Sequence, residues 1–533
     1  MSGSAEGKPQ VEEYGLDALA ASAEAVLAGL GPLAVALAGL AGGACGAVTL
    51  EAMEELAAGQ GRELLRGVVQ LGLDAQADGE VRVAQVTGAD GVPRRRAERG
   101  HSRPVVTTLG EVTVRRIAYR SGVKGVPSLF PRDAVLNLPP CGYSWALQRL
   151  AVMFCRSAAF GQGHEMVLAA TGVSVGKRQL EEIVLAAAAD AERFCQDPAR
   201  PRDEPPPPAA GQREGLPLLV MSADGKGVTM LPGARRPQTA RKAAKRPGQA
   251  FARRLGTGQK TGHKRIAETG VVFDVAPPDP GQEPRTPEQV MGRAPGQPAP
   301  PGPRAVNRWY TAQITASRAE TIAMLFDEAE RRDPGHARTW IALADGDNHQ
   351  IDVITAEAAR RGIEVTIVVD LIHVIEYLWK AAWCFHPPRD PAAEDWVTAA
   401  GLDILHGRTP QVIARIEAAA AADPPRPGSE HAKIIRTTLH YLTAKQPYLD
   451  YPRALANGWP IATGVIEGAC RHLVQDRMGI TGARWGLEGA QAMLWHRAIA
   501  ASGDTTAYWD WHIAQEHQRN HLSRYQHDLG LAA

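Results

Sequence analysis

Three apolar runs that each end in an aspartate constrain the fold of this chain more than any other feature. LLVMSA precedes Asp224, WIALA precedes Asp345 and VTIVV precedes Asp370. Short continuous runs of this kind are typical of strands buried on both faces of a sheet. A carboxylate that terminates such a run lies where the strand leaves the core. The sequence therefore predicts a buried central sheet with acids at the ends of several strands.

The elements around these runs indicate how the sheet is connected. Further strands are expected at residues 268–276 and 307–315, and amphipathic helices at 317–333, 350–362 and 371–383. The resulting order is three strands, helix, strand, helix, strand, helix. That order is typical of the ribonuclease H-like α/β fold, in which a three-stranded meander precedes alternating helices and strands. This expectation concerns the fold alone.

A chain of 533 residues is too long for one hydrophobic core, so several domains are expected. We predict a mainly α-helical N-terminal region, then a hairpin near 104–122 with a helix-turn-helix-like segment, a proline-rich linker, the ribonuclease H-like core, a helical insertion, and C-terminal helices that include Glu467. The corresponding boundaries are 1–100, 101–200, 201–215, 216–385, 386–448 and 449–533.

Composition excludes several classes of protein. The net charge is +1 and the six cysteines form no CxxC pair, which argues against a zinc ribbon or a disulfide framework and favours a reducing cytoplasm. Residues 25–50 are uncharged but contain six glycines and mostly alanine, so we expect no membrane span, and the N-terminus lacks a secretory pattern. The sequence shows no glycine-rich phosphate loop, so we expect no nucleotide cofactor.

The acids themselves suggest a metal-dependent chemistry. In a sheet with the expected strand order, Asp224 and Asp345 lie side by side, where two carboxylates repel unless a divalent cation neutralises them. Hard oxygen ligands suit Mg²⁺ or Mn²⁺, and two such ions can support an in-line phosphoryl displacement. Glu467 supplies a third acid, from a helix whose face also carries Cys470, Arg471 and Val474.

Alternatives remain at each of these positions. Any single acid can be an ordinary strand-end carboxylate, and Glu467 can form an i,i+4 salt bridge with Arg471. Asp370 can replace Asp345 as the second ligand. Asp347 and Asn348 are explained as N-cap candidates for the helix that follows. His349 and His373 can assist phosphate binding or be structural histidines.

A basic insertion follows Asp224 and predicts contact with DNA. No acid occurs between Asp224 and Glu268, whereas the stretch from residue 235 to residue 265 holds eleven lysines and arginines: Arg235, Arg236, Arg241, Lys242, Lys245, Arg246, Arg253, Arg254, Lys260, Lys264 and Arg265. The alternative is a solvated basic loop. A second insertion, Pro277 to Pro303, holds ten prolines and is expected to be a spacer.

Four further residues are candidates for DNA contact. Lys177 and Arg178 begin the second helix of the helix-turn-helix-like segment, although two packed helices without a DNA role are an equal alternative. Arg471 lies one helical turn after Glu467. Trp485 can stack on an unpaired base or pack in the core, and packing is the role we favour.

Several segments together carry a resemblance to a known family: MSADGKGV, ALADGDNHQID, VVDLIHVIEYLWKAAWCF, GWPIATGVIEGACRHLV and, upstream, LFPRDAVLNLPP. They resemble the ISKra family of insertion-sequence transposases over about residues 100–525. The resemblance implies a DDE-type transposase with a ribonuclease H-like core, Mg²⁺ or Mn²⁺, and a homodimer or larger oligomer on transposon-end and target DNA. Matched by motif, its acidic triad is Asp224, Asp345 and Glu467.

The expected reaction is cleavage and transfer of transposon ends. Two alternatives are kept: a ribonuclease H-like nuclease or resolvase that cleaves without joining, and a catalytically inactive DNA-binding regulator. The first would give no joined product from a pre-cleaved end, and the second would bind DNA without metal-dependent cleavage.

Overall fold

A computed structural model describes residue 31 and residues 49–197, 199–200, 218–244, 263–276, 281, 283–291, 301–480 and 482–526. The chain divides into two compact units, Met1–Asp190 with Trp509–Ala533, and Ala191–Tyr508. Some predictions fall outside the described residues: most of the uncharged stretch 25–50, the linker 201–215, much of the proline-rich insertion, and the side chains of Lys242, Lys245, Arg246, Arg253, Arg254 and Lys260.

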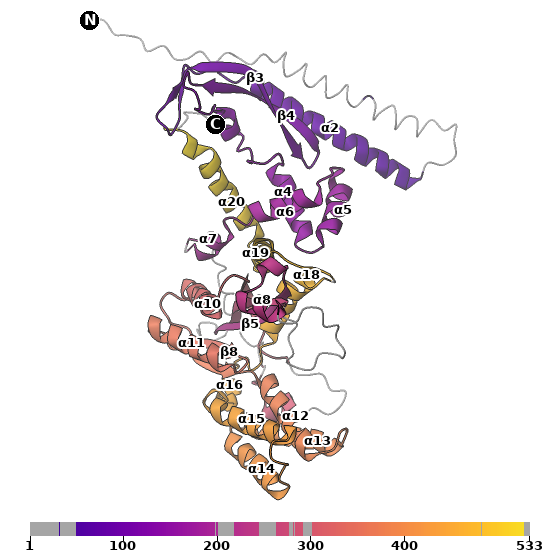
Figure 1. The fold of residues 1–533 in the computed structure, drawn as a ribbon, viewed down its shortest axis with the longest axis vertical. Helices are drawn as coiled ribbons and strands as arrows, with labels where there is room; N and C mark the ends of the chain where they lie inside the picture. The colour runs from indigo at the N-terminus through magenta and orange to yellow at the C-terminus, as the bar shows by residue number, and fades with distance from the viewer. Residues whose placement is uncertain are drawn as a thin grey trace, which may run out of the picture. The chain divides into compact units, whose positions relative to one another are not determined.

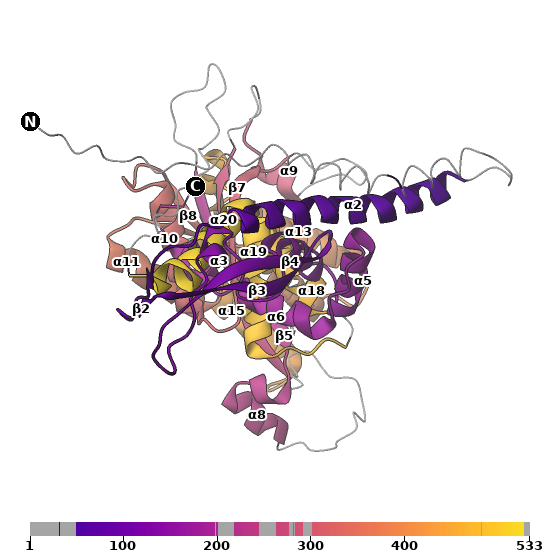
Figure 2. The ribbon, with the colours of Figure 1, turned by 90° about the horizontal axis from the view of Figure 1, so that it is seen from above.

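The first unit begins with a long helix that lies along a β-hairpin. Helix α2 (Leu50–Asp78) runs beside β4 (Gly110–Arg120), which pairs antiparallel with β3 (Arg96–Thr107), as Figures 1 and 2 show. Gln70 of the helix exchanges hydrogen bonds with the backbone of Thr113. The predicted hairpin is therefore present, with a first strand that starts earlier than expected. Two short strands, β1 (Val86–Thr87) and β2 (Pro93–Arg94), precede it.

Four helices follow the hairpin: α3 (Pro131–Val135), α4 (Trp145–Cys155), α5 (Phe160–Thr171) and α6 (Lys177–Ala186). The last three pack on one another. A Cβ on Gly163 would lie 2.8 Å from the Sγ of Cys155, so this close approach of α5 to α4 needs a glycine.

The predicted helix, Thr-Gly turn and second helix are present in α5 and α6. Gly172 ends α5 in the left-handed conformation, with φ of 71°. Lys177 and Arg178 begin α6, as the sequence indicated, and both are exposed. Arg178 pairs with Glu182 on the same helix.

The C-terminal residues complete the first unit. Helix α20 (Thr505–Asn520) belongs to this unit from Trp509 onward, and η4 (Leu522–Arg524) follows it. His512 lies 2.8 Å from buried Asp190 through Nδ1, and Arg519 donates to the same carboxylate. Tyr525 pairs antiparallel with Gly88. Residues from the two ends of the sequence therefore share one core.

The second unit has a mixed α/β fold around a five-stranded sheet. Its strands are β5 (Leu219–Thr229), β6 (Lys264–Val275), β7 (Ala305–Gln313), β8 (Trp340–Ala344) and β9 (Thr366–Val369). Their spatial order is β7-β6-β5-β8-β9. The first three pair antiparallel, whereas β8 pairs parallel with β5 and with β9. The predicted order of strands and helices is confirmed.

Helices connect and cover these strands. The two crossovers use α10 (Arg318–Arg332) and α11 (Asn348–Arg361), and α12 (Leu371–Phe385) leaves the last strand. Ser317 caps α10 in a capping box with Glu320. The residues between 386 and 448 form α13 (Pro391–Leu405), α14 (Thr409–Ala422), α15 (Glu430–Lys445) and η2 (Gln446–Tyr448), which gather beside α12 in Figure 1.

The remaining elements of this unit are short, apart from one helix. They are α7 (Ala191–Gln196), η1 (Pro232–Ala234), α8 (Pro237–Ala244), α9 (Pro287–Met291), α16 (Tyr451–Ala456), α17 (Gly464–Ala469), η3 (Cys470–Gln475), α18 (Asp476–Met478) and the longer α19 (Leu487–Ala501). Within the described part of the chain, no helix has the length and apolar character that a membrane crossing requires.

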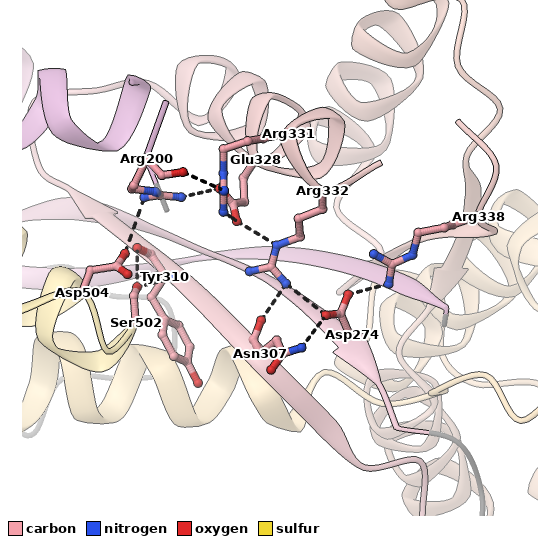
Figure 3. A network of polar contacts seen from close by, with 10 residues as sticks. All are labelled: Arg200, Asp274, Asn307, Tyr310, Glu328, Arg331, Arg332, Arg338, Ser502 and Asp504. Atoms are coloured by element: carbon pink, nitrogen blue, oxygen red, sulfur yellow. Dashed lines mark hydrogen bonds and ion pairs between the residues drawn. The ribbon is translucent and has the colours of Figure 1, made fainter. Parts of the chain in front are cut away.

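A buried ionic network fixes α10 within the second unit (Figure 3). The carboxylate of Glu328 accepts hydrogen bonds from Arg200, Arg331 and Arg332. Burial by itself raises the pKa of Glu328, but these three guanidinium groups outweigh it and hold the pKa below its ordinary value. The glutamate is therefore ionised inside the protein.

The same network reaches β6 and the edge strand β7. Arg338 lies 2.5 Å from Oδ1 of buried Asp274 on β6, and Arg332 lies 3.6 Å from Oδ2. Arg332 also donates to the backbone oxygen of Asn307, whose side chain donates to Asp274 (Figure 3). Helix α10 is thus bonded to β6 and β7, which lie on the other side of β5 from β8 and β9.

Candidate metal and nucleic-acid site

Asp224 lies in the middle of β5 and does not end it, so that part of the prediction is wrong. The parallel pairing of β5 with β8 stops at Ser222 and Leu343, but the antiparallel pairing with β6 continues as far as Thr229. The residues after Asp224 remain a strand because the basic segment from Lys264 supplies them with backbone partners. Asp224 therefore sits where β5 separates from β8, and it is half-buried.

Asp345 follows β8 directly, as expected, and β8 is the parallel neighbour of β5. Its Oδ1 accepts a hydrogen bond from the N–H of Asp347 over 2.8 Å. Asp347 caps α11, because its side chain accepts from the N–H of His349. Between the two acids, Gly346 has φ of 90°, and a Cβ there would lie 2.6 Å from Oη of Tyr441. This turn accordingly requires glycine.

Asp370 follows β9, is fully buried and caps α12 through the N–H of Ile372. Its Oδ2 accepts from the hydroxyl of Thr463 over 2.5 Å and lies 2.9 Å from Nδ1 of His373. The same Thr463 hydroxyl lies 3.2 Å from Oε1 of Glu467. One threonine therefore connects the third strand-end acid to the predicted catalytic glutamate.

The pKa values of Asp370 and His373 shift in opposite directions. Burial raises the pKa of Asp370, but hydrogen bonds from His373, Thr463 and the Ile372 backbone outweigh burial, and the pKa lies below its usual range. The hydrogen bond with Asp370 raises the pKa of His373, with burial opposing it and the charge of Asp345 adding to it. The arrangement favours an ionised aspartate beside a protonated histidine.

Glu467 lies in α17, which continues without a break into a π-helical segment, η3, and then α18. Cys470 and Val474 are buried on this segment, whereas the side chain of Arg471 is 80% exposed and lies 3.9 Å from Asp476. No ion pair joins Arg471 to Glu467 among the described residues. A π-helix turns less per residue than an α-helix, so the expected i+4 neighbour moves off the face of Glu467.

Cys470 links this helix to the sheet. Its Sγ lies 3.4 Å from Oδ2 of Asp224. Burial, followed by the charge of Asp224, raises the pKa of the thiol to about 12, so the thiol keeps its proton and donates it. Because Cys470 is one turn from Glu467, the predicted first and third acids belong to one region of the molecule.

Two groups of side chains have the spacing that a metal ion requires in the described part of the chain. One combines Asp370, His373 and Glu467, at the strand ends. Asp224 and Asp345 belong to neither group, so the predicted triad is not assembled around one point in this structure. The choice between Asp345 and Asp370 therefore remains a prediction for experiment.

The second group, Asp190, His512 and Glu516, lies in the first unit and is buried. Arg519 donates to both carboxylates, and Asn520 donates to Glu516 over 2.6 Å. The carboxylates already have donors from the protein, which is the usual arrangement of a structural polar network.

Two buried polar atoms beside the strand-end acids have no protein partner in the described residues: Oε1 of Gln350 and Oη of Tyr441. The other end of Gln350 donates to the backbone oxygen of Ala223, next to Asp224, over 2.7 Å. Tyr441 faces the Gly346 turn, next to Asp345. A buried polar group without a partner costs about 1–3 kcal/mol, so both atoms favour a bound water or hydrated ion. Carboxylate oxygens of the neighbouring acids together with the amide oxygen of Gln350 are ligands of the kind that a divalent cation takes.

The basic residues that are described lie on two elements. Arg236 and Arg241, around the start of α8, are exposed, while Arg235 is half-buried. Lys264 and Arg265 begin β6, opposite the end of β5. Nε of Arg265 donates to the backbone oxygen of Ile314 over 2.8 Å, so part of this guanidinium is used within the protein. Strand pairing thus places positive charge on the continuation of the strand that carries Asp224.

Trp485 is only 7% exposed, and its indole N–H donates to the backbone oxygen of Met478. The guanidinium of Arg477 lies 4.8 Å from its ring centre. The backbone N–H of Trp485 donates to the backbone oxygen of Thr229 at the end of β5. The backbone oxygen of Trp485 accepts from the N–H of Leu231. The packing role that the sequence favoured is the one consistent with this burial, and the enclosed ring is not placed to stack on a base.

Several site residues were missed from the sequence. Thr463 had no distinguishing signal, since its role depends on Asp370, which is 93 positions away in sequence. Arg318 begins α10 and lies 3.2 Å from Glu268 and 2.5 Å from Asp347, balancing acids near the site. Gln350 and Tyr441 are equally unmarked. These contacts arise from the crossing of distant segments, which local patterns do not reveal.

No family model matches the chain, and no curated protein matches it.

Proposed function

We propose that this chain is a DDE-type DNA transposase with a ribonuclease H-like catalytic core, acting with Mg²⁺ or Mn²⁺. The strand order β7-β6-β5-β8-β9, with an antiparallel meander followed by two parallel strands, supports the choice of fold. The fold alone does not give the activity, so the proposal depends on the site.

The single observation that carries it is the placement of acids from three separate segments at one edge of the sheet. Asp224 lies on β5 just past its pairing with β8, Asp345 follows β8 directly, and the helix of Glu467 reaches Asp224 through Cys470. Of these acids, Glu467 belongs to one candidate metal group with Asp370 and His373, whose ligand atoms all lie within 4.8 Å of one another. The buried oxygens of Gln350 and Tyr441 have no partner in the described residues, which favours a bound water or ion beside the same acids.

Asp224, Asp345 and Glu467 would hold the metal, with Asp370 as an additional or replacing ligand. When bound, divalent ions supply Lewis-acid activation of the attacking oxygen and stabilisation of the leaving oxygen. The chain itself orients the carboxylates: Cys470 donates to Asp224, the Asp347 N–H to Asp345, and Thr463 to Asp370. Exposed Arg236 and Arg241 and the start of β6 provide cations for DNA phosphates.

The test uses the full chain with its own insertion-sequence ends and Mg²⁺. Asp224→Asn, Asp345→Asn, Asp370→Asn and Glu467→Gln are compared with wild type for strand cleavage. We expect loss of cleavage in the triad variants with DNA binding retained. A residue whose replacement leaves cleavage unchanged is not a ligand, and Asp345 and Asp370 are separated in this way.

A second assay distinguishes a transposase from the alternatives. A pre-cleaved end with a free 3′-hydroxyl is supplied with target DNA, and a joined product is expected. Cleavage of intact ends without joining indicates a nuclease or resolvase. Binding of ends without any metal-dependent cleavage indicates a regulator.

A further inference from the structure

Trp383 is exposed in a way that no other tryptophan of the chain is. All eleven tryptophans lie in the described residues, and Trp383, at 42% exposure, is the only one that is neither buried nor half-buried. An indole held in water forfeits the free energy that burial of its apolar surface would supply. The position of Trp383 thus favours a partner that covers the ring.

The ring is already part of an ordered aromatic surface. Trp379 lies one turn before Trp383 on α12, with ring centres 5.3 Å apart and planes inclined by 25°. Ile372, Glu376, Trp379 and Trp383 follow the spacing i, i+4, i+7, i+11 and therefore share one face of the helix. Ile372 is 50% exposed, so this face is open to solvent along the length of α12.

The helix starts at the candidate metal site. Asp370 is its N-cap and His373 is in its first turn. At 1.5 Å per residue, Trp379 and Trp383 lie about 13 and 20 Å from Asp370 along the helix axis. At the duplex spacing of about 3.4 Å per phosphate, this distance corresponds to roughly four to six nucleotides, and an extended unpaired strand covers it with fewer.

The chemistry of the face suits bases and phosphates together. Lys380 lies between the two tryptophans in sequence, and its ammonium group is 4.4 Å from the ring centre of Tyr377. Its pairing with Glu376 is long, at 3.9 Å, and both side chains are more than half exposed, so the lysine is available to a phosphate. Exposed large apolar residues on this helix are otherwise limited to Ile372, too few for an apolar protein interface.

We propose that Trp379 and Trp383 form a base-stacking platform for an unpaired DNA segment that flanks the reacting phosphate. The inference rests on the proposed function for the identity of the DNA, but it concerns a separate binding step. Stacked bases present the same π-face whatever their sequence, so the platform is tolerant of sequence and selective for single strands. Trp383, and not the buried Trp485, is the tryptophan assigned to base contact.

The test measures affinity by fluorescence anisotropy in EDTA, so that no cleavage is needed. The probes are one labelled duplex with blunt ends and the same duplex with single-stranded flanks of about two or about ten nucleotides. Trp383→Leu and Trp383→Phe are matched variants, because both keep an apolar side chain but only phenylalanine keeps an aromatic ring. Thermal unfolding of each variant establishes that both remain folded.

Trp383→Leu is expected to weaken binding of the ten-nucleotide flank by roughly 5- to 150-fold, as removal of one stacking residue does. Trp383→Phe retains most of the affinity, and the blunt and two-nucleotide probes are bound equally by all three proteins. Equal affinity of Trp383→Leu and wild type for the long flank would overturn the proposal. So would an equal loss on all probes, or a change of oligomeric state in Trp383→Leu, which would identify the face as a contact between copies.

The outcome is independent of catalysis. If wild type shows flank-dependent binding through Trp383 but no Mg²⁺-dependent cleavage, the proposed function fails and the platform stands. If cleavage depends on Asp224 while the tryptophan variants bind all probes as wild type does, the platform fails and the proposed function stands.

Discussion

The thiol of Cys470 donates a hydrogen bond to Oδ2 of Asp224 over 3.4 Å, and the two residues are 246 positions apart in sequence. The contact joins the strand that carries one predicted metal ligand to the helix that carries another. It also uses one of the lone pairs of Asp224, which leaves Oδ1 to accept from the N–H of Gly225. The orientation of this carboxylate therefore depends on the helix of Glu467.

Removing the thiol donor should weaken metal binding without removing a ligand. For Cys470→Ala we expect a requirement for about 10- to 100-fold more Mg²⁺ in the cleavage assay, as for other residues that orient metal ligands. Cys470→Ser keeps a donor and should remain close to wild type. The measurement is cleavage rate against Mg²⁺ concentration. A Cys470→Ala protein with an unchanged Mg²⁺ dependence would show that the contact does not orient Asp224.

Glu328→Gln should destabilise the second unit by about 3–5 kcal/mol, because it removes the buried carboxylate charge that three guanidinium groups share. Urea unfolding followed by tryptophan fluorescence measures the change. Glu63→Gln is the control: Glu63 pairs with Arg66 on the surface of α2, and no detectable change is expected. A Glu328→Gln midpoint equal to wild type would contradict the role of the network.

The same glutamate predicts a direction for acid sensitivity. Since the folded-state pKa of Glu328 lies below its ordinary value, its contribution to stability is complete above that ordinary value and is lost as the pH falls through the folded-state pKa. The stability difference between wild type and Glu328→Gln should shrink below about pH 4.5. Urea midpoints at a series of acidic pH values test this, and a difference that grows with acid would be inconsistent with it.

His373 predicts a dependence in the opposite direction. Its pKa is raised by Asp370, so the pair stabilises the fold fully below the unfolded histidine pKa of about 6.5 and loses that contribution as the pH rises through the folded-state value. In EDTA, the melting temperature of wild type relative to His373→Asn should fall as the pH rises above about 6.5. A constant difference above that pH would mean that the pair does not titrate as described.

Trp485→Ala should lower the stability by about 3–5 kcal/mol, as expected for truncation of a buried tryptophan. At a temperature where the variant is folded, its affinity for flanked and blunt DNA should match wild type. Urea unfolding and anisotropy provide the two readouts. A selective loss of affinity for single-stranded flanks would show that Trp485, to which we assign a packing role, contacts unpaired bases.

Much of the sheet was predictable because a buried strand is visible in the local sequence as an apolar run, such as the one before Asp345. The helix caps were predictable for the same reason, and Asp347 is an N-cap as expected. The end of β5 was not, because the polar residues after Asp224 form a strand only when Lys264 and its neighbours pair with them. A local pattern does not contain that partner.

The site was only partly predictable. An acid at a strand end signals the edge of a sheet, so the neighbourhood of Asp345 and Asp370 followed from the sequence. The link from Asp370 through Thr463 to Glu467 depends on a helix that packs on β5 and β6, and the π-helical segment after Ala469 changes which residues share its face. The choice of Trp383 over Trp485 for base contact depends on how exposed each side chain is, and exposure is a property of the assembled fold.

The return of α20 to the first unit has a consequence for how the protein is made. The contacts of Asp190 with His512 and Arg519, and the pairing of Gly88 with Tyr525, can form only after residues 512–525 have left the ribosome. Domains generally fold in order of synthesis, N-terminal first. Here the unit that begins the chain is finished last, so a truncated translation product would display its central sheet while its opening unit stayed incomplete.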